Sequence, residues 1–423
     1  MGLVSALFTG VTGLSSNSQA LEILGDNISN VNTIGFKGSR PVFSSILSTI
    51  LNNGAFRPTV GRGSQVSSIM QNNTQGAFET STNALDLAVD GSGYFIVNDG
   101  SANYYTRAGQ FRLNSGGKVQ AVGGEVLQGY KMTNDVAGGD LTDIDLAGVQ
   151  SKPNASTYFT LGANLNAAAS AGVSFTSPIT LYNSVGDQII LTLNFKKLDG
   201  TNSWNVTPTS STGTVTSAAS TTLTFDTAGQ LEFISATSGN EAATGAVADQ
   251  TITLSFEGNP VADDLNVIWD LADATPAGAI STNGKVTGYA AASNNNSFVQ
   301  DGFGTGTLIA TTVGSTGIIE GLFDNGQTEQ LFQVGMADFL SANGLTRRGA
   351  NLFAESADSG QPIIGTSQTG GFGSIMGSTL ELSNIDLATQ FINLIQTQQA
   401  FQASARIINT TDDLLTETVN LVR

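Results

Sequence analysis

Two long amphipathic segments stand at opposite ends of the chain. Residues 4–29 and 387–422 each repeat apolar side chains every seven positions, the spacing of helices that pack along one another. In the first segment the repeat is carried by Val4, Leu7, Val11, Leu14, Leu21 and Ile28. In the second it is carried by Leu387, Phe391, Leu394, Phe401, Ile408 and Leu415. The pattern predicts two terminal helices with all other residues inserted between them.

These predicted helices carry almost no charge. Residues 1–21 and 387–405 contain no acidic or basic side chain, whereas a helix exposed to solvent normally has a charged outer face. Two arrangements remain open: a helical hairpin within one chain, and a polymer in which helices of neighbouring copies surround one another. The polymer is favoured, because a charge buried among helices is costly. Gly2, Gly10 and Gly13 allow close helix approach, although each costs up to about 1 kcal/mol in helix propensity.

The first helix is expected to end near Asn30, in a segment rich in turn-forming residues. Gly35 can adopt a positive φ. No nucleophile or phosphate-binding loop accompanies the segment, so we interpret it as a chain reversal. Its characteristic residues are Asn27, Asn30, Asn32, Thr33, Gly35, Phe36 and Lys37.

The residues between the helices read mainly as β-structure. Residues 38–76 lack clear periodicity and suggest an amphipathic turn followed by an extended arm. Beyond them, alternating runs separated by glycine turns predict strands at 85–90, 94–97, 104–113, 118–122, 125–130, 317–322 and 330–337. Residues 151–298 are rich in Thr, Ser and Ala, and predict strands at 188–195, 221–225, 250–256 and 266–269. With eleven acids against four lysines, this part reads as an exposed, acidic β-sandwich or barrel.

The predicted fold is therefore multidomain and mainly β, with terminal α-helices that form a coiled-coil-like inner domain and two β-rich domains inserted between them. We assign residues 1–30 with 380–423 to the helical domain, and 31–75 with 366–379 to a connecting arm. Residues 76–150 with 299–365 form an inner β-domain, and residues 151–298 an outer one.

Composition narrows the function. The formal net charge of −18 opposes binding to nucleic acid or to an anionic membrane. The chain has no cysteine and no histidine, which removes thiol nucleophiles, disulfides, thiolate zinc sites and the commonest general base. No basic residue precedes Lys37, so a secretory signal peptide is not expected. No stretch approaches the roughly 20 apolar residues of a membrane span.

The remaining candidates for chemistry are weak. Asp140, Asp143 and Asp145 lack the spacing of a calcium loop. Asp86 and Asp90 could form an acid/base pair, but a solvated strand face is the better interpretation. The glycine clusters at 302–304 and 370–373 lack the context of a phosphate loop, and Arg347-Arg348 suggests a surface or intersubunit ion pair. We predict no enzyme activity, cofactor or metal site.

Four motifs resemble the family of flagellar rod and hook proteins. The segment Leu24–Lys37, LGDNISNVNTIGFK, resembles the family signature NNIANxNTxGFK. Residues 85–97 resemble PLDLAIxGxGFF, with Ala84 in place of the usual proline, and residues 105–109 match YTRxG. Residues 380–387 resemble LExSNVDL, followed by Leu394-Ile395 and residues 398–401. Together the motifs cover about 1–150 and 300–423, in the family's order.

The resemblance implies a structural subunit, and the large middle segment favours a hook subunit over a distal rod protein. Such a subunit would polymerise with copies of itself into a curved tube that transmits torque from rod to filament. It would be exported by the flagellar type III apparatus without a cleaved signal, and would meet rod proteins, the hook cap and the hook–filament junction proteins. The alternatives are a distal rod protein, a secreted β-rich adhesin and a glycosidase using acids within residues 187–273.

Overall fold

The computed structural model describes residues 2–50, 59–133, 135–200, 202–217, 220–235, 249–256, 262–271, 273–274, 280–281 and 285–421. The chain forms two compact units. Unit 1 contains Met1–Gly148, Ala310–Leu322 and Thr328–Arg423, and unit 2 contains Val149–Ile309 and Phe323–Gln327. The finer division into four domains stays a prediction.

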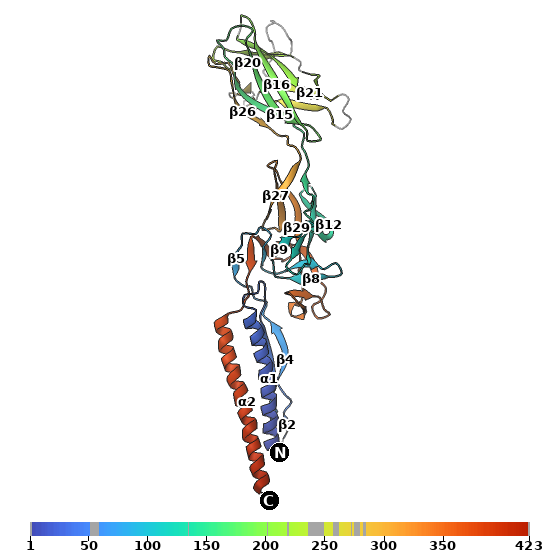
Figure 1. The fold of residues 1–423 in the computed structure, drawn as a ribbon, viewed down its shortest axis with the longest axis vertical. Helices are drawn as coiled ribbons and strands as arrows, with labels where there is room; N and C mark the ends of the chain where they lie inside the picture. Colours follow the sequence, from blue (N-terminus) through green and yellow to red (C-terminus); the bar gives the residue numbers. More distant parts are fainter. Residues whose placement is uncertain are drawn as a thin grey trace. The chain divides into compact units, whose positions relative to one another are not determined.

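Unit 1 begins and ends with the two predicted helices. Helix α1 spans Gly2–Ser29 and helix α2 spans Leu387–Leu421. They lie side by side and antiparallel, with both termini at the same end (Figure 1). A Cβ at Gly10 would lie 2.9 Å from Cγ1 of Ile408, and one at Gly13 would lie 2.9 Å from Oγ of Ser404. The expected role of these two glycines in close helix approach is therefore confirmed. No helix in the described part of the chain combines the length and apolarity of a bilayer span.

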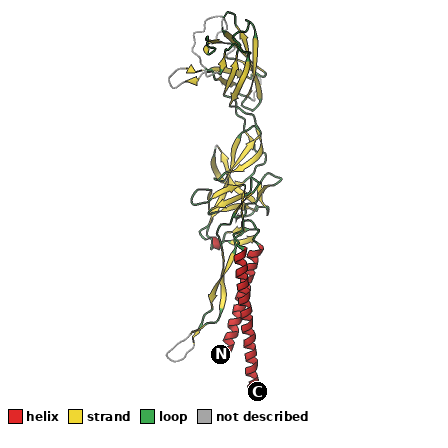
Figure 2. Cartoon of the chain, turned by 90° about the vertical axis from the view of Figure 1, so that its left-hand side faces the viewer, coloured by secondary structure: helices red, strands yellow, loops and turns green. Residues whose placement is uncertain are grey.

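A two-stranded hairpin accompanies α1 (Figure 2). Strand β1 (Ser39–Ser45) pairs antiparallel with β4 (Ser64–Gln71), with a register shift between Val42 and Phe43. The hairpin is fixed to the helix by polar contacts, such as Oγ of Ser16 at 3.3 Å from Oγ of Ser64. Strands β2 (Thr49–Ile50) and β3 (Thr59–Val60) extend it, and its tip lies outside the described residues. The prediction of an amphipathic turn at the start of 38–76 is wrong, because residues 39–45 form strand β1; the extended conformation predicted after it is present, but as a paired hairpin against α1.

The β-part of unit 1 is built around strands β7, β11 and β29. Strand β29 pairs with both β7 and β11, and three further short pairings tie the later part of the chain to the earlier part: β33 with β6, β34 with β5, and β31 with β8. The strands are β5 (Phe78–Thr80), β6 (Leu87–Asp90), β7 (Tyr94–Asn98), β8 (Asn103–Thr106), β9 (Phe111–Leu113), β10 (Val119–Ala121), β11 (Val126–Thr133), β12 (Val136–Asp143), β28 (Ile318–Phe323), β29 (Thr328–Asp338), β30 (Thr346–Gly349), β31 (Leu352–Ala354), β32 (Ile363–Thr366), β33 (Ser374–Gly377) and β34 (Thr379–Glu381), with a 3-10 turn η1 at Ala342–Gly344.

An aromatic cluster fills part of this core. The rings of Tyr105 and Phe339 lie 4.7 Å apart, edge to face, and Tyr94 contacts Phe339 and Phe353 in the same manner. Edge-to-face pairs contribute about 0.5–1.5 kcal/mol beyond the area that they bury. The cluster joins residues from the two halves of the sequence, so both halves contribute to the core of unit 1.

The core of unit 2 lies between two sheets. The first has the order β18-β21-β22-β14-β25, with β26 added to β14, and the second has the order β15-β16-β17-β19-β20. Phe195 of β16 contacts Trp269 of β22 at 6.2 Å between ring centroids, so the sheets pack against each other. This confirms the mainly β fold expected for the middle segment. The strands are β13 (Gln150–Ser151), β14 (Tyr158–Asn164), β15 (Ser174–Tyr182), β16 (Gln188–Lys197), β17 (Ser203–Ser210), β18 (Thr214–Val215), β19 (Thr221–Phe225), β20 (Leu231–Ser235), β21 (Gln250–Ser255), β22 (Leu265–Trp269), β23 (Asp273–Ala274), β24 (Ile280–Ser281), β25 (Val286–Thr287), β26 (Asn294–Gln300) and β27 (Gly306–Val313).

Candidate functional site

Three of the sequence motifs meet at one buried carboxylate. Glu381, on β34 just before α2, is fully buried. Its Oε1 accepts a 2.5 Å hydrogen bond from Nζ of Lys37, which follows α1, and a 2.9 Å bond from the backbone N–H of Gly76. Its Oε2 lies 3.5 Å from Nη1 of Arg107, which follows β8. One acid therefore joins the segments that follow α1 and precede α2 to the β-part of unit 1.

The two cations have further partners. Nζ of Lys37 also donates to the carbonyl of Thr74 at 2.8 Å, and Arg107 donates to the carbonyls of Val89 and Gly91 at 3.2 and 2.7 Å. Burial lowers the pKa of Lys37 below its usual value, and the hydrogen bond that Lys37 donates to Glu381 opposes that shift. Each buried charge in the cluster has partners, which offsets the cost of its burial. Removing one charge would leave the others buried without a partner of opposite charge.

Gly35 brings the first motif against this cluster. Its backbone N–H donates to the carbonyl of Glu381 at 2.7 Å. Its φ is +68°, and a Cβ there would lie 2.6 Å from the backbone N of Ala108. Both the left-handed conformation and the close approach require glycine. The chain reversal predicted at this residue is therefore also a contact between three motifs.

Side-chain amides complete the junction. Asn27 accepts from the backbone N–H of Ser39 at 2.8 Å, donates to the Ser39 carbonyl at 2.7 Å, and reaches Gln390 of α2 at 3.3 Å. Asn384 accepts from the N–H of Gly38 at 3.0 Å and donates to the carbonyls of Asn72 and Thr74. In the segments between the helices and the strands, where the backbone has no regular hydrogen-bond pairing, these side-chain hydrogen bonds take its place.

The other motif residues hold the turn itself. Asn30 donates to the carbonyl of Asp26 at 2.9 Å and accepts from Oγ1 of Thr33 at 3.1 Å, whereas Asn32 is exposed. The guanidinium of Arg347 lies 5.5 Å from the ring centroid of Phe36. Most residues of the predicted motif therefore form contacts within the chain, whereas Asn32 lies at the surface.

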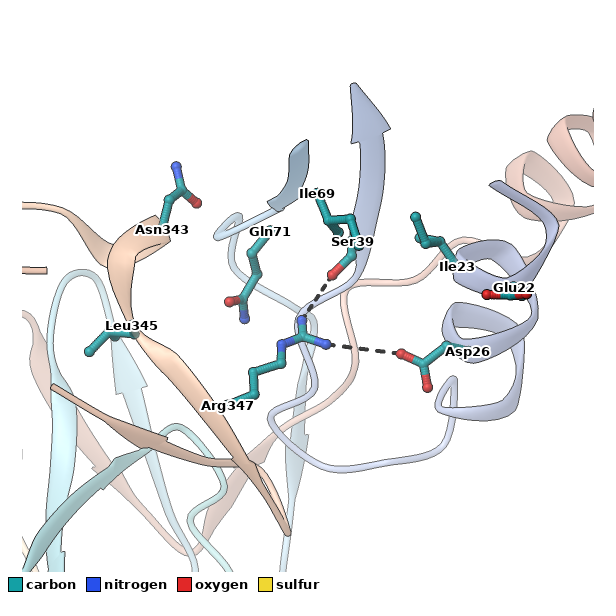
Figure 3. A pocket seen from close by; sticks show the side chains of 9 residues that line it. All are labelled: Glu22, Ile23, Asp26, Ser39, Ile69, Gln71, Asn343, Leu345 and Arg347. Carbon is teal, nitrogen blue, oxygen red and sulfur yellow. Dashed lines mark hydrogen bonds and ion pairs between the residues drawn. The ribbon is translucent and has the colours of Figure 1, made fainter. Parts of the chain in front are cut away.

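Arg347 borders a groove beside α1. Its Nη2 donates to Oγ of Ser39 at 3.0 Å and its Nη1 lies 4.0 Å from a carboxylate oxygen of Asp26 (Figure 3). The cavity has a volume of about 430 Å³, and Glu22, Ile69 and Gln71 also line it. The surface ion pair expected for the two arginines is thus present within the chain for Arg347, while Arg348 is exposed.

The predicted helix seams are only partly covered within one chain. Val4, Val11, Leu387 and Phe391 are exposed. The other seam residues are half-buried: Leu7, Leu14, Leu21, Ile28, Leu394, Phe401, Ile408 and Leu415. The helix pair within the chain therefore leaves apolar surface on both helices, and contact of these residues with other copies stays a prediction.

The candidate acid pair has a structural role in one member. Asp86 is buried, and accepts hydrogen bonds from Oγ of Ser81 at 2.5 Å and Nδ2 of Asn83 at 3.0 Å, whereas Asp90 is exposed. The solvated face predicted for both residues is wrong for Asp86. Its carboxylate instead satisfies the tight loop before β6, which is buried on both faces from Leu87 to Val89.

The other candidates also have neighbours from the protein itself. Asp143 accepts from Gln128 at 2.6 Å and Lys118 at 2.7 Å, and these hydrogen bonds hold its pKa below the usual value. Within the described residues, no group of three or more acids is placed to hold a metal ion. The glycines at 302–304 and 370–373 lie in loops between strands.

Comparison with known proteins finds four family matches along the chain. The matching families are described as flagella basal body rod protein (residues 7–37), flagellar hook protein FlgE/F/G D1 domain (88–167), flagellar basal body protein FlaE D2 domain (152–303) and flagellar basal body rod FlgEFG protein C-terminal (376–421). The flagellar hook protein FlgE of Borreliella burgdorferi is 33% identical, over 99% of this chain and 100% of its own. The chain belongs to the flagellar hook protein family.

Other members of the hook protein family match equally completely. The hook protein of Treponema pallidum is 31% identical over the whole of both chains. That of Escherichia coli is 28% identical over 98% of this chain and 100% of its own. Unit 2 largely coincides with the match to the D2 domain, so the segment that favoured a hook subunit is itself a family feature.

The start of α2 in this hook family member depends on an ionised cap. Asp386 accepts from Oγ1 of Thr389 at 2.8 Å and from the N–H of Ala388 at 3.0 Å, and these bonds lower its pKa. The lowered pKa means that the cap is complete above the ordinary aspartate pKa of about 4 and is lost as the pH falls below it.

We therefore expect Asp386→Ala to accelerate hydrogen exchange in the first turn of α2 severalfold at pH 7. Asp386→Asn keeps a capping oxygen and should retain most of the protection. It should also remove the acid-dependent loss of protection that we expect in the unmodified chain as the pH falls through the lowered pKa of Asp386. Equal exchange in all three chains at pH 7 would contradict the capping role.

Proposed function

We propose that this chain is the structural subunit of a flagellar hook, and that copies of it polymerise into a curved tube that transmits torque from rod to filament. The main observation is the apolar surface that the terminal helices leave open. Phe8 is 58% exposed, Phe391 50% and Ile395 53%. Large exposed apolar patches mark interaction sites, and this one lies on helices that lack charge over most of their length.

The partner of this surface is best supplied by other copies of the chain. A neutral, apolar helix face fits another face of the same kind, and head-to-tail contacts that do not close produce a helical polymer. We propose that the seam residues of both helices, from Val4 to Ile28 and from Leu387 to Leu415, pack in an inner layer of the tube. Packing along these seams would supply torsional stiffness.

The β-rich parts would supply the bending. Unit 2 is strongly acidic, and many of the large apolar side chains of its two sheets lie in one core. Contacts between neighbouring acidic surfaces are weak, because exposed ion pairs contribute little energy and like charges repel. Such contacts can change as a tube bends, while the helices keep theirs.

Further partners follow from the same assignment. We propose export by the flagellar type III apparatus without a cleaved signal, and contacts with rod proteins, the hook cap and the hook–filament junction proteins. A distal rod protein and a β-rich adhesin are the alternatives.

Electron microscopy of the chain tests this proposal. Purified chain, concentrated and salted out, should form curved tubes, and antibodies against unit 2 should label the hook of isolated flagella. Straight tubes with label on the rod would indicate a distal rod protein. Monomers that never polymerise, with label spread over the cell surface, would indicate an adhesin.

A further inference from the structure

The side chains of Glu22 on α1 and Arg406 on α2 have no partner within the described part of the chain, and the same is true of Asp412, Asp413 and Glu417 further along α2. Glu22 is the first charged residue of α1, and Arg406 is the first charged residue of α2. Both side chains are exposed, and neither forms a hydrogen bond or an ion pair among the described residues. They have opposite signs, and the other charges of the two helices are Asp26 on α1 and Asp412, Asp413 and Glu417 on α2, all acidic.

The two charges cannot meet in one chain. The antiparallel pairing places Gly13 against Ser404 and Asn27 within 3.3 Å of Gln390. Glu22 therefore lies opposite the part of α2 near residue 395. At 1.5 Å per residue, Arg406 is displaced along the helix axis by roughly 16 Å from that level. An ion pair between them requires two copies.

The surroundings of Glu22 fit an incoming arginine. The groove in Figure 3 is lined by α1, by the β1–β4 hairpin and by residues 343–347; Arg347 already contacts Asp26 there, whereas Glu22 has no partner within the described residues. Ile69 of β4 is 61% exposed, so it offers an apolar surface for the methylene groups of an arginine whose head reaches Glu22.

The same groove also contains a buried hydrogen-bond donor without an acceptor. Nε2 of Gln71 is buried and has no hydrogen-bond partner among the described residues. A buried donor without an acceptor costs about 1–3 kcal/mol. Gln402 and Asn409 stand four residues before and three residues after Arg406, which places them on the same face of α2. Their amide oxygens are acceptors that Arg406 itself lacks.

We propose that Arg406 on α2 of one copy enters the groove between α1 and β4 of a second copy, where it pairs with Glu22 and brings an amide oxygen of Gln402 or Asn409 to Gln71. The inference rests on the proposed polymer. It adds a specific contact that fixes the axial offset between neighbouring copies, which apolar seams alone fix poorly because they can slide by whole heptads.

Charge reversal tests the contact. Glu22→Arg and Arg406→Glu should each raise the critical concentration for polymerisation at least tenfold, and the double variant should restore it to within about threefold. Lys131→Glu, an exposed reversal on β11, is the matched control and should polymerise normally. Thermal unfolding of each monomer checks that the units remain folded.

A crosslink supplies an independent measurement. The natural chain has no cysteine, so cysteines placed at 22 and 406 are unique. A short bis-maleimide should join them between chains in assembled tubes and not in monomers. The contact would be overturned if the unmodified chain forms tubes but the double variant does not regain polymerisation and no crosslink appears. That outcome would leave the hook assignment intact. Failure of the unmodified chain to form tubes would overturn both.

Discussion

Glu381→Gln is expected to lower the free energy of unfolding of unit 1 by about 3–5 kcal/mol, the usual cost of breaking a buried ion pair. The carboxylate is fully buried and is the shared partner of Lys37 and Arg107. Glutamine fills the same volume but leaves two buried cations without an anion. The loss corresponds to a fall of roughly 10 °C in the Tm of this unit.

Calorimetry of the monomer measures this effect, because unit 2 unfolds as its own core and provides an internal reference. Glu79→Gln, a change at the exposed middle residue of β5, is the control and should leave the Tm nearly unchanged. Adding Lys37→Met to Glu381→Gln should recover part of the loss, since one of the stranded cations is then gone. A Tm for Glu381→Gln equal to that of the control would show that the cluster does not hold unit 1 together.

Leu394→Asp is expected to abolish polymerisation while both units stay folded. Leu394 is half-buried in the middle of the uncharged part of α2. A carboxylate buried there without a partner costs several kcal/mol, and the cost recurs at every copy added. The critical concentration should therefore rise at least a hundredfold, as measured by sedimentation and electron microscopy. Leu14→Asp should act in the same way from α1.

Two further variants separate assembly from folding. Phe391 is exposed in the single chain, so Phe391→Asp should leave the monomer's circular dichroism unchanged and still prevent tubes. Leu113→Asp, at an exposed position on β9, should polymerise as the unmodified chain does. If Leu394→Asp and Phe391→Asp both form normal tubes, the helices do not form the inner layer of the tube.

The helices and about a third of the strands could be predicted because their patterns are local. Seven-residue repeats identify α1 and α2, and alternation identifies strands such as β16, whose side chains are alternately buried. The β1–β4 hairpin could not be found in this way. Its strands are short of apolar residues, and the contacts that order it, such as Ser16 with Ser64, come from α1.

The charge cluster was missed for a related reason. Lys37 and Glu381 are 344 residues apart, and no local pattern links them. A signal was nevertheless present: the GFK, YTR and LEL segments each contain one charged residue among neutral neighbours. Isolated charges in otherwise neutral motifs are expected to need one another, and a search for such residues would have suggested the cluster.

The pairing of strands β13 and β27 bears on how the middle segment of the chain can change in evolution. They pair antiparallel, with Gln150 opposite Thr307 and Ser151 opposite Gly306, so the two points where the chain begins and completes its long excursion are adjacent. A segment whose ends are adjacent can be replaced by another segment, or by a simple turn, without disrupting the domain into which it is inserted. Evolution can therefore lengthen, shorten or replace residues 152–305 as a cassette, while selection acts on the charge cluster and the helices separately.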